Sequence, residues 1–226
     1  MTNEKFNNLF GRKPRNPQNE KITQFHMDIA ASIQKVTEEI MINLAKSIRK
    51  EYNIKNLCLA GGVALNCVAN GKILKEKIFD NIWIQPAAGD AGGSLGAALA
   101  LWHIDQGNKR SVNLNDDMNG SYLGAEYNQE EIERELKAAG ANFETFNYAE
   151  LIDKTSEFLS NEKAIGRFQG RMEFGPRALG GRSILGDPRS DKMQKNLNLK
   201  VKYRESFRPF APSVLREDLS EWFEMN

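Results

Sequence analysis

The chain has 226 residues and a formal net charge of +1, and 40% of its residues are hydrophobic and 27% are charged. This composition permits a hydrophobic core and indicates a globular protein of one large domain or two smaller ones. No apolar run approaches the roughly 20 residues that span a bilayer, and the first residues lack the apolar stretch of a secretory signal. We therefore expect a cytoplasmic protein without a membrane partner, in which Cys58 and Cys67 are buried free thiols.

The first half of the sequence alternates between helix and strand patterns. Residues 1–24 are polar and are predicted to form an irregular lead-in, and residues 24–50 are predicted to form a long amphipathic helix. Strands are predicted at 56–62 (NLCLAGG) and 81–86 (NIWIQP), and helices at 64–77 and 94–103. This alternation predicts an α/β architecture. The apolar face of the long helix consists of residues at steps of three and four, namely Phe25, Ile29, Ile33, Val36, Ile40, Leu44 and Ile48.

A change of composition divides the chain near residues 106–120, which are rich in Gly, Asn and Asp and are predicted to be a linker. Residues 115–160 then contain eleven acidic and three basic residues, and include a helix-like run at 129–140. A strand is predicted at 163–168. We expect two domains, residues 1–110 and 121–226, which meet near this linker.

Residues 162–216 are strongly basic, with thirteen Lys or Arg against five Asp or Glu. Three interpretations compete: a solvated face with scattered ion pairs, a nucleic-acid surface, or a site for a small phosphorylated ligand. The pI of about 7.7 and the acidic neighbouring segment argue against a long polyanion, so no nucleic-acid partner is expected. The constrained runs at 173–177 and 207–210 argue against a free surface. The small phosphorylated ligand is therefore favoured.

Two glycine-rich turns follow the predicted strands of the first half. The turn at Gly61-Gly62 would place bare backbone N–H groups at a helix start, which suits a phosphate or the sugar of a nucleotide. The second turn, Gly89 to Gly93, adds the carboxylate of Asp90, which can hold a metal ion or a ribose hydroxyl. Alternatively, the glycines only reverse the chain and Asp90 caps the following helix.

Four segments carry a resemblance to a known family. They are LAGGVALNCVANGKI (59–73), IWIQPAAGDAGGSLGAA (82–98), GRMEFGPRALGGRSILGDPR (170–189) and NLKVKYRESFRPFAPSVL (198–215). The first two resemble the second lobe of the actin-like ATPase superfamily, in its O-carbamoyltransferase branch, which includes the enzymes that carbamoylate nodulation factors and antibiotics. The last two are similar to the beginning of that family's C-terminal, carbamoyl-phosphate-processing domain, which is also expected to be α/β.

The resemblance implies an activity and its cofactors. A carbamoyl group would pass from carbamoyl phosphate, through an ATP-derived carbamoyl-adenylate, to a hydroxyl of a small-molecule acceptor. Besides ATP, a divalent metal is implied, Fe²⁺ at the nucleotide or Mg²⁺ with ATP, and Asp90 would ligate it. The phosphate of carbamoyl phosphate would be held by Arg177, Lys202 and Arg208, with Arg171, Arg182 and Arg204 as weaker candidates. The nucleotide would be bound by Gly61, Gly62, Val63 and Asn66, together with Gly92 and Gly93.

The sequence also departs from the family pattern. The family's first actin-like lobe, with a metal-binding HxxxH pair, is expected before residue 1, and the C-terminal domain is expected to continue past Asn226. We therefore expect a fragment of a larger enzyme, whose activity by itself is in doubt. His26 and His103 fall on predicted helices, where a packing or surface role is expected. The alternatives are a threonylcarbamoyl-transfer or hydrogenase-maturation relative, or a non-catalytic binding or assembly module.

Overall fold

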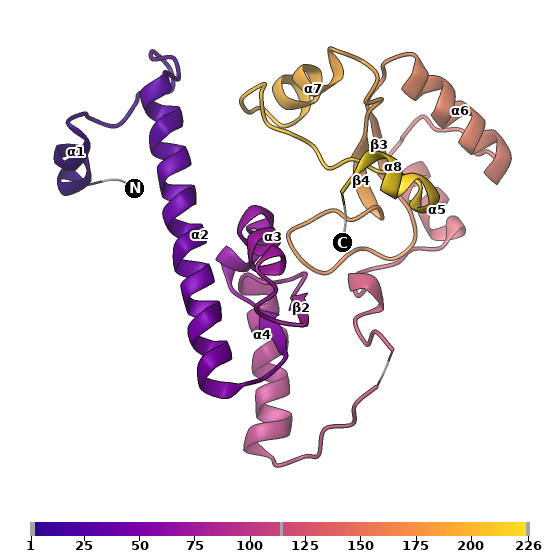
Figure 1. Ribbon diagram of the computed structural model, residues 1–226. Coiled ribbons are helices and arrows are strands. Elements are labelled where there is room, and N and C mark those ends of the chain that lie inside the picture. Colours follow the sequence, from indigo (N-terminus) through magenta and orange to yellow (C-terminus); the bar gives the residue numbers. More distant parts are fainter. Residues whose placement is uncertain (1–2, 114, 225–226) are drawn as a thin grey trace. The chain divides into compact units, whose positions relative to one another are not determined.

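The computed structural model describes residues 3–113 and 115–224 (Figure 1). The chain divides into two compact units, residues 1–88 and 89–226. This division lies earlier in the chain than the predicted linker, and the predicted domains, 1–110 and 121–226, stay a prediction. Within the described residues no helix is long and apolar enough to cross a membrane.

The first unit is built around a short parallel strand pair. Its elements are α1 (Glu4–Phe10), α2 (Gln24–Tyr52), β1 (Asn56–Leu59), a 3-10 turn (Gly62–Leu65), α3 (Cys67–Lys75) and β2 (Asn81–Ile84). β1 pairs with β2 in parallel, with Asn56 opposite Asn81 and Leu59 opposite Ile84. A parallel pair needs a crossover, and α3 supplies it while packing against α2 (Figure 1). The predicted β–α–β order is thereby confirmed.

The core of this unit lies under one side of α2. Ala45 of α2, Leu57 of β1, Ile73 of α3 and Phe79 form the buried cluster, with Met41, Ile42, Leu59, Ile78 and Ile82 packed against it. The predicted apolar face of α2 is a different stripe, and Ile33 on it is 60% exposed. The helix was therefore predicted correctly, but periodicity alone did not identify the face that packs in this unit.

Several predictions for the first unit were wrong in detail. The lead-in contains helix α1, because the side chain of Asn3 accepts the N–H of Phe6 at 3.0 Å and Gly11 ends the helix in the left-handed region. β1 is only half buried, since Leu57 is buried and Cys58 is exposed. Cys67 is exposed as well, so both thiols are free but not buried.

The second unit begins with a helix and continues with a two-stranded antiparallel sheet. Its helices and strands are α4 (Asp90–Ala100), α5 (Gln129–Ala138), α6 (Tyr148–Ser160), β3 (Ile165–Phe168), β4 (Arg182–Leu185), α7 (Met193–Asn196) and α8 (Leu219–Trp222). β3 pairs with β4, with Ile165 opposite Leu185 and Phe168 opposite Arg182. Strand 163–168 and helix 129–140 were predicted in the right places, whereas α6 and β4 were not predicted.

Helix α4 begins four residues earlier than expected. It was predicted from Ser94, after a glycine break at 89–93, but the first helical residue is Asp90 and Gly89 precedes it in an extended conformation. Gly92 and Gly93 therefore lie inside the helix, because glycine tolerates helical dihedral angles at a cost of roughly 1 kcal/mol and does not end a helix by itself. The predicted linker contains little regular structure in the described residues, apart from a short helical turn at Asn119–Ser121.

Candidate functional site

The first glycine turn of the sequence analysis is an open backbone surface. Gly61 has φ = +95°, and its N–H donates to the carbonyl of Ala88 at 2.7 Å, which fixes the turn after β1. A Cβ atom built on Gly61 or Gly62 would meet no atom within 4 Å, and Val63 is exposed. The space beside Gly61 and Gly62 is therefore open, while the N–H of Gly61 and the carbonyls of Gly61 and Val63 are used in hydrogen bonds within the unit.

Asn66, the predicted side-chain contact of the nucleotide, is instead held by its own unit. Its amide exchanges hydrogen bonds with Gln34 of α2, and its oxygen also accepts the N–H of Ala69 at 3.1 Å. Gln34 donates in turn to Glu38 at 2.9 Å, and Glu38 pairs with Lys72. These bonds from Lys72 and Gln34 lower the pKa of the Glu38 carboxyl. This polar chain ties the start of α3 to α2, so Asn66 has a structural task.

The second glycine segment presents one carboxylate. Asp90 is exposed in the first turn of α4, where a negative charge interacts favourably with the helix dipole. Gly93 lies in the same helix, and a Cβ there would meet no atom within 4 Å. Among residues 3–113 and 115–224, no three His, Cys, Asp or Glu side chains gather in a way that could hold a metal ion. Asp90 thus offers a single carboxylate to a metal.

In the basic segment, residues 173–182 form a turn that we call the arginine loop. Glu173 is buried, with 3% of its surface exposed, and accepts the N–H groups of Leu179 at 2.8 Å and Gly181 at 2.7 Å. The Nε of Arg182 lies 3.2 Å from the other carboxylate oxygen. Burial raises the pKa of the Glu173 carboxyl, but the hydrogen bonds from backbone N–H groups outweigh it, so the pKa is lowered. The ionised carboxylate of Glu173 at the start of the loop therefore contacts residues at the end of the loop.

Arg177 and Arg182 have different roles in the arginine loop. The guanidinium of Arg182 pairs with Glu173 and donates to the carbonyl of Gly175. It also lies 3.5 Å from the carbonyl oxygen of Arg177. Arg177 itself is exposed, and no bond of its guanidinium to another described residue is present. The loop therefore uses Arg182 internally and leaves Arg177 available.

A second buried polar residue organises the segment after α7. Asn198 has no exposed surface, and its amide donates to the carbonyls of Ser206 at 3.2 Å and Arg208 at 2.8 Å. Its oxygen accepts the Nε of Arg204 at 2.6 Å, and the Arg204 guanidinium lies 5.0 Å from the ring centroid of Phe210. Asn198 thus fixes the backbone of the segment that carries Lys202 and Arg208.

The remaining cations of the prediction differ in how far the fold engages them. Lys202 is exposed, and Arg208 is exposed while donating to Glu205 at 2.9 Å. Arg171 donates to the carbonyl of Gly124 and to the carboxylate of Glu126, both at 2.9 Å. Arg171, Arg182 and Arg204 are therefore structural in this conformation, and Arg177 and Lys202 are the freest of the six.

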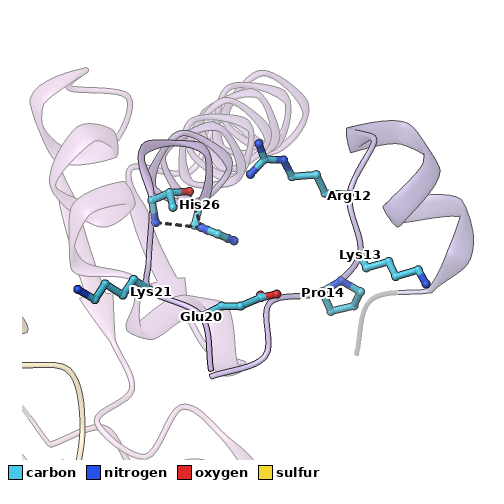
Figure 2. Close-up of a pocket in the computed structure, with 7 residues that line it drawn as sticks. Arg12, Lys13, Pro14, Glu20, Lys21 and His26 are labelled. Atoms are coloured by element: carbon cyan, nitrogen blue, oxygen red, sulfur yellow. Dashed lines mark hydrogen bonds between the residues drawn. The ribbon is translucent and has the colours of Figure 1, made fainter. Parts of the chain in front are cut away.

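The predicted site residues are only partly gathered at hollows of the described chain. A cavity of about 520 Å³ in the second unit is lined by residues that include Asp90, Glu173 and Arg182, but not Arg177, Lys202 or Arg208. The other, of about 410 Å³, lies in the first unit between the lead-in and the start of α2 (Figure 2).

The two histidines take part in local structure, as expected from their positions. At the hollow of the first unit, His26 accepts the N–H of Thr23 on its Nδ1 at 3.0 Å, which caps α2 (Figure 2). The Nδ1 of His103 lies 3.0 Å from the carbonyl oxygen of Asn108.

Sequence reasoning missed Glu173 and Asn198, the two residues that organise the basic segment. A signal was present for Glu173, because a lone carboxylate among cations is a natural ion-pair partner. Its two bonds to backbone N–H groups depend on the fold of the loop. For Asn198 the sequence holds no such signal, since Asn is ordinary on a surface.

Comparison with known proteins identifies the family. Residues 1–99 match the family described as Carbamoyltransferase N-terminus, and residues 156–226 match Carbamoyltransferase C-terminus. An uncharacterized protein of Synechocystis, sll1178, is 56% identical over 228 residues, which cover all of this chain and 37% of the relative. The nodulation protein NolO of Bradyrhizobium diazoefficiens is 44% identical over 203 residues, 90% of this chain and 36% of the relative.

The nodulation protein NolNO of Sinorhizobium fredii is also 44% identical, over 90% of this chain and 29% of the relative. The chain spans about a third of the length of these curated relatives. Both family matches lie in the expected order, with the N-terminal match before the C-terminal one. The chain therefore belongs to the carbamoyltransferase family.

Proposed function

We propose that this chain takes part in the transfer of a carbamoyl group from carbamoyl phosphate to a hydroxyl of a small-molecule acceptor. The observation that carries the proposal is the exposed guanidinium of Arg177, held on the arginine loop of a carbamoyltransferase-family chain. Lys202 and Arg208, on the segment that Asn198 fixes, would add further positive charge. These cations would bind the phosphate group and stabilise the charge that collects on it when the carbamoyl group leaves.

The nucleotide part of the proposal rests on the first unit. The open space beside Gly61 and Gly62 fits the close approach of a nucleotide, whereas the Asn66 side chain is committed to Gln34 and Ala69. Water would cleave carbamoyl phosphate to carbamate and phosphate, and a carbamate oxygen would attack the α-phosphorus of bound ATP to give a carbamoyl-adenylate and pyrophosphate. The acceptor hydroxyl would then attack the carbamoyl carbon, lose its proton and displace AMP.

A metal ion fits the carboxylate of Asp90 only in part. An exposed carboxylate is a suitable ligand for Mg²⁺ or Fe²⁺, and nucleotide phosphates and water could complete the coordination. The metal would neutralise phosphate charge. We propose Asp90 as one ligand of such a metal.

The proposal is tested by two variants that address different ligands. Arg177→Ala is expected to weaken the binding of carbamoyl phosphate roughly 10- to 150-fold, the range of a hydrogen bond to a charged group. Gly62→Val is expected to weaken ATP binding, because the side chain occupies space that is open in the native protein. Each variant should leave the other ligand's affinity unchanged, and isothermal titration calorimetry measures both.

A matched control for each variant uses the same substitution at another position. Lys163→Ala removes an exposed cation of the basic segment before β3, and Gly71→Val adds a side chain in α3, where a Cβ also meets open space. Wild-type affinity of Arg177→Ala for carbamoyl phosphate would contradict the phosphate site. If neither ligand bound the folded native protein, a non-catalytic binding or assembly module would become the better description.

A further inference from the structure

The arginine loop is closed from inside by Glu173. Its carboxylate accepts N–H groups from Leu179 and Gly181, and it faces the guanidinium of Arg182. Arg182 extends this network to the carbonyls of Gly175 and Arg177. Both sides of the loop are thus tied to one buried charge, and the peptide of Arg177 belongs to the same network.

The backbone of the loop allows the Glu173 carboxylate to approach it closely. A Cβ on Gly181 would lie 3.3 Å from Cδ of Glu173 and 3.1 Å from the carbonyl oxygen of Arg171, which is tighter than an ordinary contact. Gly180 has φ = +122°, a conformation that side-chain-bearing residues rarely adopt. Two consecutive glycines therefore bring the N–H of residue 181 to the buried oxygen.

We infer that Glu173 is a positioning residue, whose buried carboxylate fixes residues 173–182 so that the guanidinium of Arg177 is held ready for the phosphate of the carbamoyl donor. This inference rests on the proposed function, because it gives Glu173 its role through Arg177. The physical reason is preorganisation: a guanidinium on a mobile loop must be ordered when the ligand binds, and that ordering reduces affinity. One carboxylate oxygen of Glu173 accepts both backbone N–H groups and the other faces the Nε of Arg182, so we assign Glu173 an effect on the ligand through the loop and not through a contact of its own.

The test is a double-mutant cycle between positions 173 and 177. Glu173→Gln keeps an oxygen for the backbone N–H groups but removes the charge that faces Arg182. We expect it to weaken carbamoyl phosphate binding at least about threefold in the native background and not at all when combined with Arg177→Ala. Arg182→Lys is a milder second variant, which keeps the charge but not the fork, and its effect should also vanish without Arg177.

Hydrogen exchange gives a readout that does not depend on the ligand. The amides of Leu179 and Gly181 should exchange faster in Glu173→Gln than in the native protein. The matched control is Glu131→Gln, because the Glu131 carboxylate also accepts a backbone N–H, that of Asn128 at 2.9 Å, at the start of α5. This control should change exchange at Asn128 and leave carbamoyl phosphate affinity at the native value.

The outcomes separate the inference from the proposed function. If Arg177→Ala weakens binding but neither Glu173→Gln nor Arg182→Lys does, the positioning role is overturned and the phosphate site stands. If Glu173→Gln causes the same loss with and without Arg177, its effect is general and the positioning role is again overturned. If Arg177→Ala itself keeps native affinity, the phosphate site of the proposed function is wrong, and the inference that rests on it is overturned as well.

Discussion

The glycine turn of the first unit and the arginine loop of the second unit differ in what their internal hydrogen bonds leave accessible. In the turn, the side chain of Asn66 bonds to Gln34 and Ala69 and the N–H of Gly61 bonds to Ala88, but the space beside Gly61 and Gly62 stays open. In the arginine loop, backbone N–H groups donate to Glu173, and the side chain of Arg177 is exposed. The turn thus offers a ligand open space beside its backbone, and the arginine loop offers it one side chain that is unpaired among the described residues.

This difference shows how candidate residues should be ranked. A polar residue in a motif is a poor candidate for ligand binding once the fold satisfies its hydrogen bonds, because withdrawing them would leave buried groups unpaired. By this criterion Arg177 and Lys202 rank above Arg171, Arg182 and Arg204. In the first unit the backbone N–H groups of Gly62 and Val63 rank above the N–H of Gly61, which bonds to Ala88, and above the side chain of Asn66.

The largest effect on the free energy of unfolding is expected when a buried side chain with several internal hydrogen bonds is removed. Asn198→Ala would leave the carbonyl of Ser206 and the Nε of Arg204 without this partner, and the carbonyl of Arg208 with Gln194 alone. We expect the free energy of unfolding of the second unit to fall by about 2–4 kcal/mol, since each unpaired buried group costs about 1–3 kcal/mol. Urea unfolding followed by circular dichroism measures this loss.

The control for this variant is Asn161→Ala, which truncates an exposed asparagine of the same unit at the end of α6. Its unfolding free energy should stay within about 0.5 kcal/mol of the native value. A similar small change in Asn198→Ala would break the comparison, because it would mean that the segment after α7 holds its shape without Asn198.

A smaller effect on stability is expected when an exposed side chain such as that of Asp90 is changed. Asp90→Asn removes a charge from the first turn of α4, which lowers stability by only about 0.3–1 kcal/mol through the helix dipole. If Asp90 ligates the metal, the variant should bind less Mg²⁺ or Fe²⁺ in the presence of ATP. Metal analysis after dialysis measures it, with Asp105→Asn, an exposed carboxylate after the same helix, as the control. Equal metal content in both variants would reduce Asp90 to a helix-terminal charge.

The sequence predicted elements better than contacts. The helix at 24–50 was correct because its periodicity is strong, but apolar residues lie on more than one side of it. The packed side, with Met41, Ile42 and Ala45, therefore depended on where β1 and α3 come to lie. The four-residue strand β4 was missed because it follows directly on the glycines of the arginine loop.

The candidate site was predicted in the same uneven way. Gly175 and Pro176 indicated a constrained backbone before Arg177, and the structure shows such a loop. The sequence could not show which cations form ion pairs and hydrogen bonds within the loop. Arg182 and Arg177 are both arginines in a glycine-rich run, and only the position of the buried Glu173 carboxylate distinguishes them. That position is a property of the folded chain.

The smallest effect concerns a cation that the fold engages at the surface. Arg189 donates to Asp187 from Nε and Nη2 and from its backbone N–H, and these bonds lower the pKa of the Asp187 carboxyl to about 2. Because the folded pKa lies below the ordinary value of 3.8, the pairing stabilises the fold fully above pH 3.8. This stabilisation is lost as the pH falls through about 2.

In Arg189→Ala the titration of Asp187 should move back toward 3.8, because the guanidinium bonds that cause most of the shift are gone. Carbon-13 NMR of the Asp187 carboxyl follows it directly, and Lys192→Ala, which removes a neighbouring cation that does not bond Asp187, should leave the midpoint near 2. Arg189→Ala should also keep native affinity for carbamoyl phosphate. A loss of affinity would show that a cation paired in the free protein can still serve the ligand, and the ranking of Arg177 above the paired arginines would then fail.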